Sequence, residues 1–299
     1  MLPDISIEFI LNHYAVSLHK ALKLHKFELL RRTGLVISGV TSCGTIPTVE
    51  QVAKKKHNVL LICVDDLRNE LGCTGQSHMV TPNVDRLAQS GRLFTHHYVH
   101  QAACGPSRSC LLAGVRTDAW GYLGRRDLPK NEAVSLPELF KQVGYSTVTM
   151  GKVGHSAGKR YRGFEKEKSN HGPWKYGISA LFGYAHGKSH HKMIWKNDKE
   201  DYLPWEAADV DDKGYLDAHN AESAVKQLQE LSKEDKPFFL AVGFYKPHLP
   251  LNAPKKYWDL YEQDKLPVAK WQQKPIGVKP DWTFHHGTIK NYVSVQANH

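Results

Sequence analysis

The sequence lacks a run of eighteen or more apolar residues, so no segment predicts a membrane-spanning helix. It also lacks internal repeats, which argues against a repeat array. Cysteine is scarce: five residues in a chain of 299 do not make a disulfide scaffold, and their odd number leaves at least one thiol unpaired. Collagen-like and disordered compositions are excluded by 41% hydrophobic and 23% charged residues. We therefore expect most of the chain to fold, without a transmembrane segment.

Positive charge is in excess, with 40 Lys and Arg against 30 Asp and Glu and a net charge of +10. This balance favours polyanionic partners, such as nucleic acid, anionic membranes and sulfated or phosphorylated substrates. Charge alone does not choose among them. Because the sequence contains no recognisable nucleic-acid-binding motif, we expect no nucleic-acid partner.

The length permits one large domain or two smaller ones, and we expect one α/β domain behind a leader. Residues 1–56 form the leader, in which a basic, helix-prone stretch precedes residues rich in Gly, Ser and Thr. Within it, KFELLRRTGLVISGVTSCGT combines a basic flank, a short apolar stretch and small residues, as a secretory signal does. An irregular leader is the alternative, because this segment lies well inside the chain. Residues 57–299 are assigned to the folded domain.

The folded domain alternates between strand-like and helix-like segments. Residues 58–64, NVLLICV, form a continuous apolar run that predicts a strand buried on both faces of a parallel sheet. The segment TPNVDRLAQSG predicts a helix with Thr81 as N-cap, Pro82 as first residue and Gly91 beyond its end. Further strands are expected at 92–100, 145–151 and 237–244, and further helices from Pro106, over 135–144 and over 217–232. This alternation predicts an α/β fold with a mostly parallel sheet flanked by helices.

Two segments depart from the alternation. Residues 159–211 are irregular and rich in Gly, His, Trp and Tyr, which predicts a long insertion over one edge of the sheet. From Leu266 onward, Pro, Lys and Trp dominate and periodicity is lost.

Two adjacent carboxylates, Asp65 and Asp66, follow the first predicted strand. Ligands of open α/β sheets gather outside the carboxyl ends of the strands. Adjacent carboxylates there repel each other, and a bound divalent cation would offset the repulsion. Hard oxygen ligands favour Ca²⁺ or Mg²⁺ over Zn²⁺. The alternative is a solvated turn, because acidic turns after strands are common.

The segment HQAACGPSRSCLLAG leaves three roles open for Cys104. The first is that of a small buried hydrophobe, the commonest fate of a free cysteine. The second is a zinc ligand, for which the available partners are His96, His97, His100 and Cys110. The six-residue spacing of the two cysteines differs from the Cys-x-x-Cys pairs of ordinary structural zinc sites. In the third, Pro106 opens a helix with Cys104 at its positive end and Arg108 one turn along. Such a site suits a tetrahedral oxyanion, phosphate or sulfate.

The string CGPSR at residues 104–108 resembles the signature of the sulfatase family, in which a dedicated enzyme oxidises the cysteine to formylglycine. Four more segments occur in the family's order and spacing: NVLLICVDDLRNELGCTG, TPNVDRLAQSGRLFTHHYV, GKVGH and PFFLAVGFYKPHLPLNAPKKYWDLY. Together they span about residues 58–268, and they specifically resemble iduronate-2-sulfatase-like members. The resemblance implies an alkaline-phosphatase-like α/β fold.

The resemblance also implies a function, a sulfuric ester hydrolase acting on sulfated, glycosaminoglycan-like sugars. A formylglycine-generating enzyme would convert Cys104, and a hydroxyl of the hydrated aldehyde would attack sulfur. Asp65 and Asp66, with the modified residue 104, match metal-binding positions for Ca²⁺ or Mg²⁺. Among the other matches, Arg108 steadies the modified residue, Lys152 and His155 contact the sulfate and the hydrated aldehyde, and His248 assists the leaving group. Lys246 is a further candidate in the same segment.

The chain departs from the family pattern towards its C-terminus. No segment matches the later Asp-His or Asp-Asn pair and the lysine that complete the family's metal site, so the catalytic domain is expected to be incomplete. Ca²⁺ usually takes about six to eight oxygen ligands, more than two aspartates and a hydrated aldehyde supply.

Two other functions follow from this departure and from the superfamily. A truncated, catalytically silent relative that at most binds sulfated polymers is the alternative to an active sulfatase. A phosphatase or phosphonate hydrolase of the same superfamily is a third, disfavoured because such phosphatases usually carry Ser or Thr as nucleophile. An active member is expected to be exported, to the periplasm, the medium or the lysosome.

Overall fold

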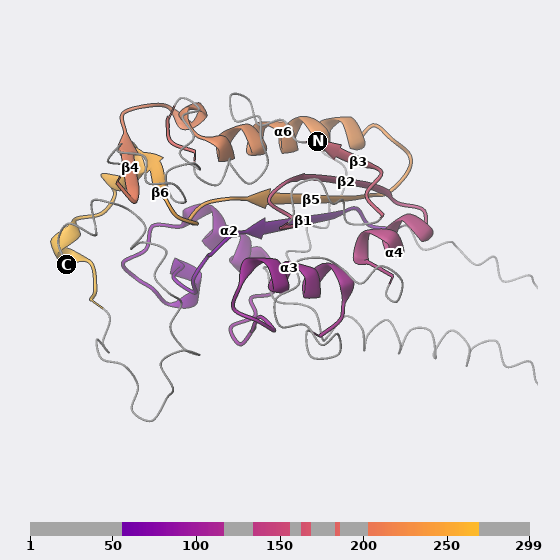
Figure 1. Ribbon diagram of the computed structural model, residues 1–299, viewed down its shortest axis with the longest axis horizontal. Coiled ribbons are helices and arrows are strands. Elements are labelled where there is room, and N and C mark those ends of the chain that lie inside the picture. The colour runs from indigo at the N-terminus through magenta and orange to yellow at the C-terminus, as the bar shows by residue number, and fades with distance from the viewer. Residues whose placement is uncertain (1–55, 117–133, 156–162, 169–182, 186–202, 269–299) are drawn as a thin grey trace, which may run out of the picture.

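The computed structural model describes residues 56–116, 134–155, 163–168, 183–185 and 203–268 (Figure 1). Its main sheet has four parallel strands in the order β1-β5-β2-β3. They are β1 (Val59–Val64), β2 (Ser146–Gly151), β3 (Lys166–Lys168) and β5 (Phe238–Phe244). Because all four are parallel, their carboxyl ends meet at one edge of the sheet.

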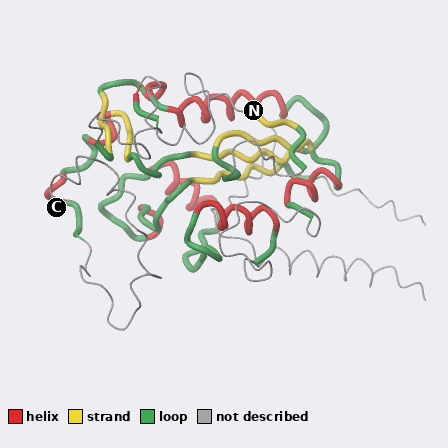
Figure 2. The backbone as a smooth tube through the Cα atoms, in the orientation of Figure 1, coloured by secondary structure: helices red, strands yellow, loops and turns green. Residues whose placement is uncertain are grey.

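Helices cover both faces of this sheet, as Figures 1 and 2 show. α6 (Leu216–Leu231) lies on one face. α3 (Cys104–Ala113) and α4 (Leu136–Gln142) lie on the other. Layers of helix, parallel sheet and helix confirm the predicted α/β fold class.

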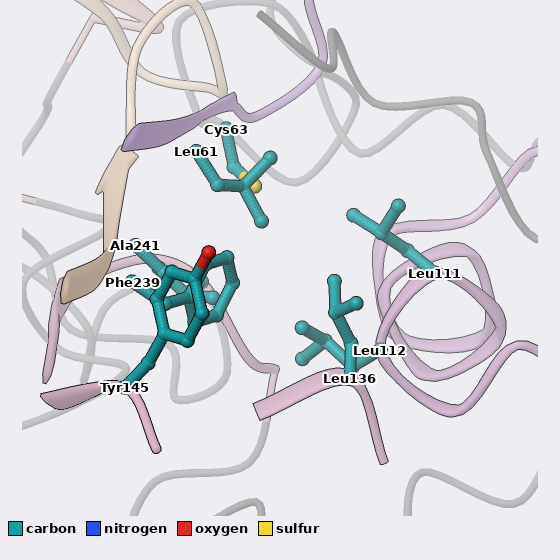
Figure 3. Packing of buried hydrophobic residues seen from close by; sticks show 9 residues of the cluster. Leu61, Cys63, Leu111, Leu112, Leu136, Tyr145, Phe239 and Ala241 are labelled. Carbon is teal, nitrogen blue, oxygen red and sulfur yellow. The ribbon is translucent and has the colours of Figure 1, made fainter. Parts of the chain in front are cut away.

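The core forms two hydrophobic clusters, one on each face of the sheet. Side chains of β5 alternate between the faces, so this strand contributes to both clusters. The cluster drawn in Figure 3 comprises Leu61, Cys63, Leu111, Leu112, Leu136, Tyr145, Val153, Phe239 and Ala241. The other comprises Leu60, Val148, Met150, Ala224, Leu231, Phe238, Leu240 and Val242. Burial on both faces explains why β1 and β5 are continuous apolar runs in the sequence.

Two shorter helices begin where the sequence predicts. α2 (Pro82–Ser90) follows Thr81 and ends at Gly91. The α4 helix follows Ser135, whose side-chain oxygen accepts the backbone N–H of Glu138, while the Glu138 carboxylate accepts the backbone N–H of Ser135. This reciprocal pair is a capping box, which stabilises the first turn.

A second, two-stranded sheet pairs β4 (Trp205–Ala208) in parallel with β6 (Leu251–Pro254). The short helix α7 (Lys255–Trp258) follows β6 directly. Single 3-10 turns complete the described elements: η1 (Gly72–Thr74), η5 (Asp212–Gly214) and η6 (Gln263–Lys265).

Two predictions differ from the structure. The strand predicted at 92–100 is wrong, since these residues form an irregular connection in which Phe94 is 50% and Tyr98 75% exposed. Among the described strands β1 pairs with β5 alone, and residues 92–100 do not add to its other edge because their aromatic side chains stay exposed and do not pack on the core. The insertion predicted at 159–211 is not wholly irregular, because β3 and β4 fall within it and β3 pairs with β2.

Several predictions fall on residues that the structure does not describe, namely the leader up to residue 55, most of the insertion and the tail beyond residue 268. Within the described part of the chain, no helix has the length and apolar character needed to cross a membrane.

Candidate active site

The candidate site lies at the carboxyl ends of the central strands, where Asp65 follows β1, Lys152 follows β2 and Tyr245 follows β5. The strands approach each other closely here. The Lys152 N–H donates to the Gly243 carbonyl at 2.9 Å, and a Cβ on Gly243 would lie 1.9 Å from the Lys152 carbonyl carbon. Only glycine therefore lets β5 pass the backbone that carries Lys152.

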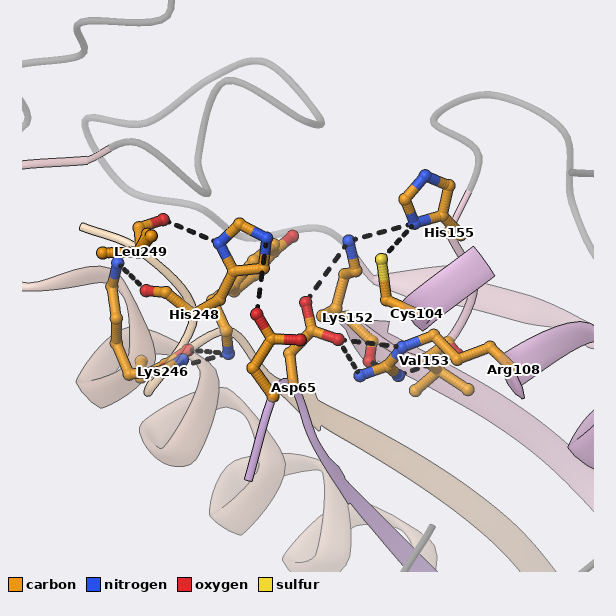
Figure 4. Close-up of polar contacts among 12 residues, drawn as sticks. Asp65, Cys104, Arg108, Lys152, Val153, His155, Lys246, His248 and Leu249 are labelled. Atoms are coloured by element: carbon orange, nitrogen blue, oxygen red, sulfur yellow. Dashed lines mark hydrogen bonds and ion pairs between the residues drawn. The ribbon is translucent and has the colours of Figure 1, made fainter. Parts of the chain in front are cut away.

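Arg108 and Asp65 form a buried ion pair beneath the site (Figure 4). The Arg108 Nε and Nη2 donate to Oδ1 of Asp65 at 3.3 and 2.9 Å. Its Nη1 donates to the carbonyl oxygens of Lys152 and of Val153, the latter at 3.0 Å. Burial alone would raise the pKa of Asp65, but the charges of Arg108 and Lys152 outweigh it and hold that pKa below its ordinary value.

Cys104 is the first residue of α3, so the helix begins two residues before the predicted start at Pro106. Its Sγ lies 3.3 Å from Nδ1 of His155. The Lys152 ammonium lies 3.5 Å from the same nitrogen and 3.6 Å from Oδ2 of Asp65. Burial raises the pKa of the Cys104 thiol and lowers that of Lys152. The helix end, the ammonium and the imidazole thus surround a thiol that stays protonated at neutral pH.

His248 reaches the site from the loop after β5 (Figure 4). Its Nδ1 lies 2.7 Å from the carbonyl oxygen of Leu249. Because a carbonyl only accepts, Nδ1 carries a proton and the ring presents Nε2 to the site. That Nε2 lies 3.8 Å from Oδ2 of Asp66.

The two adjacent aspartates have different surroundings. Asp66 adopts a left-handed backbone (φ 55°), which turns it away from Asp65. Its side chain is 53% exposed, against 2% for Asp65. The solvated-turn interpretation therefore fits Asp66 and fails for Asp65.

The described residues can be compared with what a metal site needs. Oδ2 of Asp65 is buried and has no hydrogen-bond partner, although the Lys152 ammonium lies 3.6 Å away, so this oxygen could also accept a cation. No group of three His, Cys, Asp or Glu side chains in the described ranges is arranged to hold a metal. The predicted set of Asp65, Asp66 and Cys104 is thus incomplete by itself, and the zinc site suggested by His96, His97, His100 and Cys110 does not form.

One side chain near the site, Asp217, was not predicted from the sequence, and the candidate Lys246 does not point to the sulfate position. Asp217 accepts the backbone N–H groups of Tyr245 and Lys246, and Lys246 turns its ammonium away from the site towards backbone carbonyls. The only sequence signal for Asp217 was its place at the start of a predicted helix.

Comparison with known proteins assigns the chain to a family. The family model described as Sulfatase matches residues 57–298, most of the chain. The chain belongs to the sulfatase family. The chain is 31% identical over 254 residues to iduronate 2-sulfatase of Homo sapiens, an alignment covering 83% of this chain and 45% of that protein. It is 33% identical over 291 residues to a sulfatase of Formosa agariphila, covering 84% of this chain and 54% of that protein.

A solved structure agrees at the level of the fold. The phosphonate monoester hydrolase of Agrobacterium radiobacter superposes with a TM-score of 0.54 at 23% identity, covering 71% of this chain and 45% of that one. The chain therefore spans about half the length of the relatives it matches.

Proposed function

We propose that the protein hydrolyses sulfate esters of sugars, using residue 104 as the source of its nucleophile. The observation that carries the proposal is the placement of Cys104 at the start of α3, within 3.3 Å of His155 and beside Lys152, in a chain of the sulfatase family. A sugar substrate of the glycosaminoglycan kind is supported by the similarity to a relative named for iduronate and by the net charge of +10.

The unmodified thiol is a weak nucleophile here, because burial raises its pKa. Conversion to formylglycine by a formylglycine-generating enzyme would replace it with an aldehyde, whose hydrate supplies an oxygen nucleophile. The Cys104 Sγ stands in for that oxygen. Its contact with His155 Nδ1 would then become a hydrogen bond between oxygen and nitrogen, suited to moving a proton.

The other side chains have roles that fit their positions. The Lys152 ammonium would bind a sulfate oxygen and offset the negative charge that develops there. Arg108 would act indirectly, because its described hydrogen bonds go to Asp65 and to the backbone of Lys152 and Val153. His248, with a proton already on Nδ1, would donate a second proton from Nε2 to the leaving-group oxygen.

Asp65 and Asp66 would hold a divalent cation, Ca²⁺ or Mg²⁺, which would neutralise charge on the sulfate. Oδ2 of Asp65, which accepts no hydrogen bond, supports this assignment. The other ligands would come from water, substrate, or parts of the protein outside the described residues. We also propose that the protein is exported, as the secretory layout within residues 1–56 indicates.

A catalytically silent relative that binds sulfated polymers is the second candidate, favoured by the incomplete ligand set in the described residues. One experiment separates the two. The protein is co-expressed with a formylglycine-generating enzyme, and conversion of residue 104 is measured by peptide mass spectrometry. Release of sulfate from an aryl sulfate and a sulfated glycosaminoglycan oligosaccharide is then followed with Ca²⁺, with Mg²⁺ and with a chelator.

A hydrolase shows metal-dependent turnover that is lost in Cys104→Ala and kept in the control Cys73→Ala, whose thiol belongs to η1 and not to the site. Full conversion of residue 104 without turnover on either substrate, but with retained binding of the oligosaccharide, would establish the silent relative instead.

A further inference from the structure

The loop that carries His248 is anchored at its start by Asp217, in the first turn of α6. One carboxylate oxygen accepts the N–H of Tyr245 at 2.9 Å, and the other lies 3.0 Å from that nitrogen and accepts the N–H of Lys246 at 2.8 Å. The Asn220 amide donates to Oδ1 at 3.3 Å. Both carboxylate oxygens of Asp217 thus accept hydrogen bonds from the backbone directly after β5.

The same loop is anchored at its far end by Lys246. Its Nζ donates to the carbonyl oxygens of His248 at 3.0 Å and of Pro250 at 2.6 Å. In the view of Figure 4 this ammonium lies on the opposite side of His248 from Cys104. Lys246 is therefore directed at the backbone of the loop and not at the sulfate position.

Between these anchors, the backbone N–H of His248 donates to the carbonyl oxygen of Tyr245 at 3.0 Å. The bonds that Asp217 and Lys246 make to the loop all involve backbone atoms of residues 245–250, which carry the His248 imidazole. The ring itself is oriented by its own bond to Leu249. The direction of Nε2 thus depends on where the loop backbone is held.

We propose that Asp217 and Lys246 are positioning residues that fix the loop backbone around His248 and so aim its Nε2 at the leaving-group oxygen. The inference rests on the proposed function, because it gives His248 a proton-donating role. Asn at position 217 offers one acceptor and places an NH₂ group against a backbone donor, so Asp217→Asn loosens the loop despite its similar size.

The test uses leaving groups of different acidity. A sugar alcohol needs a proton to leave, whereas an acidic phenol does not, so misplacing His248 affects the sugar sulfate most. For Asp217→Asn and Lys246→Met we expect kcat on the sugar sulfate to fall about tenfold to a hundredfold more than kcat on the aryl sulfate. The matched controls are Asp211→Asn and Lys226→Met, which change exposed side chains of the same types.

A double-mutant cycle with His248→Gln identifies the route of the effect. If Asp217 acts through His248, Asp217→Asn lowers sugar-sulfate turnover little further once His248→Gln is present. Equal losses on both substrates, or losses that multiply in the double mutant, would overturn the proposal. If Asp217→Asn does not fold, as judged by circular dichroism, Asp217→Ser, which keeps a single acceptor, takes its place.

A second readout does not require turnover, so failure of the proposed function remains distinguishable. In protein labelled with ¹⁵N-histidine, the His248 ring resonances and their pH titration are compared among wild type, Asp217→Asn and Asp211→Asn. We expect a shift for Asp217→Asn alone. An unchanged His248 ring in Asp217→Asn would sink the positioning role, whether or not the protein hydrolyses sulfate esters.

Discussion

Arg108 directs two nitrogens to a single oxygen of Asp65, with Nη2 2.9 Å and Nε 3.3 Å from Oδ1, and both side chains are almost completely buried. The second oxygen of Asp65 faces the Lys152 ammonium at 3.6 Å without a hydrogen bond. One carboxylate therefore neutralises a buried guanidinium and still presents an oxygen to the site.

Replacing Arg108 by Met should destabilise the protein strongly, because it leaves Asp65 without its main counter-charge. Removing one member of a buried pair costs about 3–5 kcal/mol of unfolding free energy. Urea denaturation at neutral pH measures the loss. The pair's contribution is fully present above the ordinary Asp pKa of 3.8 and disappears as the pH falls through the lower folded value, so the gap between wild type and variant should close in acid.

The control for this prediction is Arg68→Met, since Arg68 forms an exposed ion pair with Glu70 at 2.9 Å. Exposed pairs are worth about 0–1 kcal/mol, so little change is expected. A similar loss for both variants would show that the buried pair has no special weight.

Gly243→Ala should damage the site more than the fold. The added Cβ would meet the Lys152 carbonyl carbon at 1.9 Å, and because that atom is backbone, β5 or Lys152 must shift. Overpacking of this kind costs about 1–3 kcal/mol in stability. We expect sulfate-ester turnover to fall at least tenfold, since displacement of a catalytic group by about 1 Å can cost a hundredfold.

Gly91→Ala is the matched control. Gly91 lies at the end of α2, and a Cβ added there would come no closer than 3.4 Å to its nearest neighbour, the Leu87 carbonyl oxygen. Thermal unfolding and turnover of both variants are compared. Equal behaviour of the two alanine variants would contradict a close approach between β5 and Lys152.

Lys246 should make the free energy of unfolding change with pH in the alkaline range. Burial lowers its pKa from 10.5 to about 8, so between these values the unfolded chain binds more protons than the folded one. Stability relative to Lys246→Met should therefore rise as the pH rises from 8 to 10.5, by as much as about 3 kcal/mol. Urea unfolding across this range tests it, with exposed Lys226→Met expected to give a flat difference.

Unconverted Cys104 should react slowly with iodoacetamide at neutral pH. Burial raises its pKa above 9.0, so the reactive thiolate is scarce and the alkylation rate should still climb beyond pH 9.0. Peptide mapping of protein made without the formylglycine-generating enzyme gives the rate. The urea-unfolded chain is the reference, and a rate that levels off below about pH 8 would point instead to a thiolate nucleophile.

Elements whose burial leaves a local pattern in the sequence could be predicted from it. The strands β1 and β5 were predicted because both faces of a parallel strand are apolar, and α2 because Thr81 and Pro82 stand at its start and Gly91 beyond its end. The strand expected at 92–100 failed since its aromatic and β-branched residues say nothing about whether a partner strand is available.

The site divides in the same way. The motif containing Cys104 was evident from neighbouring letters, but the 3.3 Å contact with His155 depends on the order of strands in the sheet. Asp217 was missed because its partners, Tyr245 and Lys246, stand 28 and 29 positions away and are reached through backbone atoms. A hydrogen bond to a distant backbone N–H group leaves no pattern of side chains in the sequence.

The place of β5 in the middle of the sheet also has a consequence for synthesis on the ribosome. β1 and β2 are both paired with β5 and not with each other, and Asn58 is bonded to a residue 180 positions later. The segments bearing Asp65, Cys104 and Lys152 must therefore wait for residues 238–244 to emerge before they can be locked together. Until then the nascent chain exposes the unpaired edges of β1 and β2, and the Cys104 thiol is not yet enclosed by Lys152 and His155.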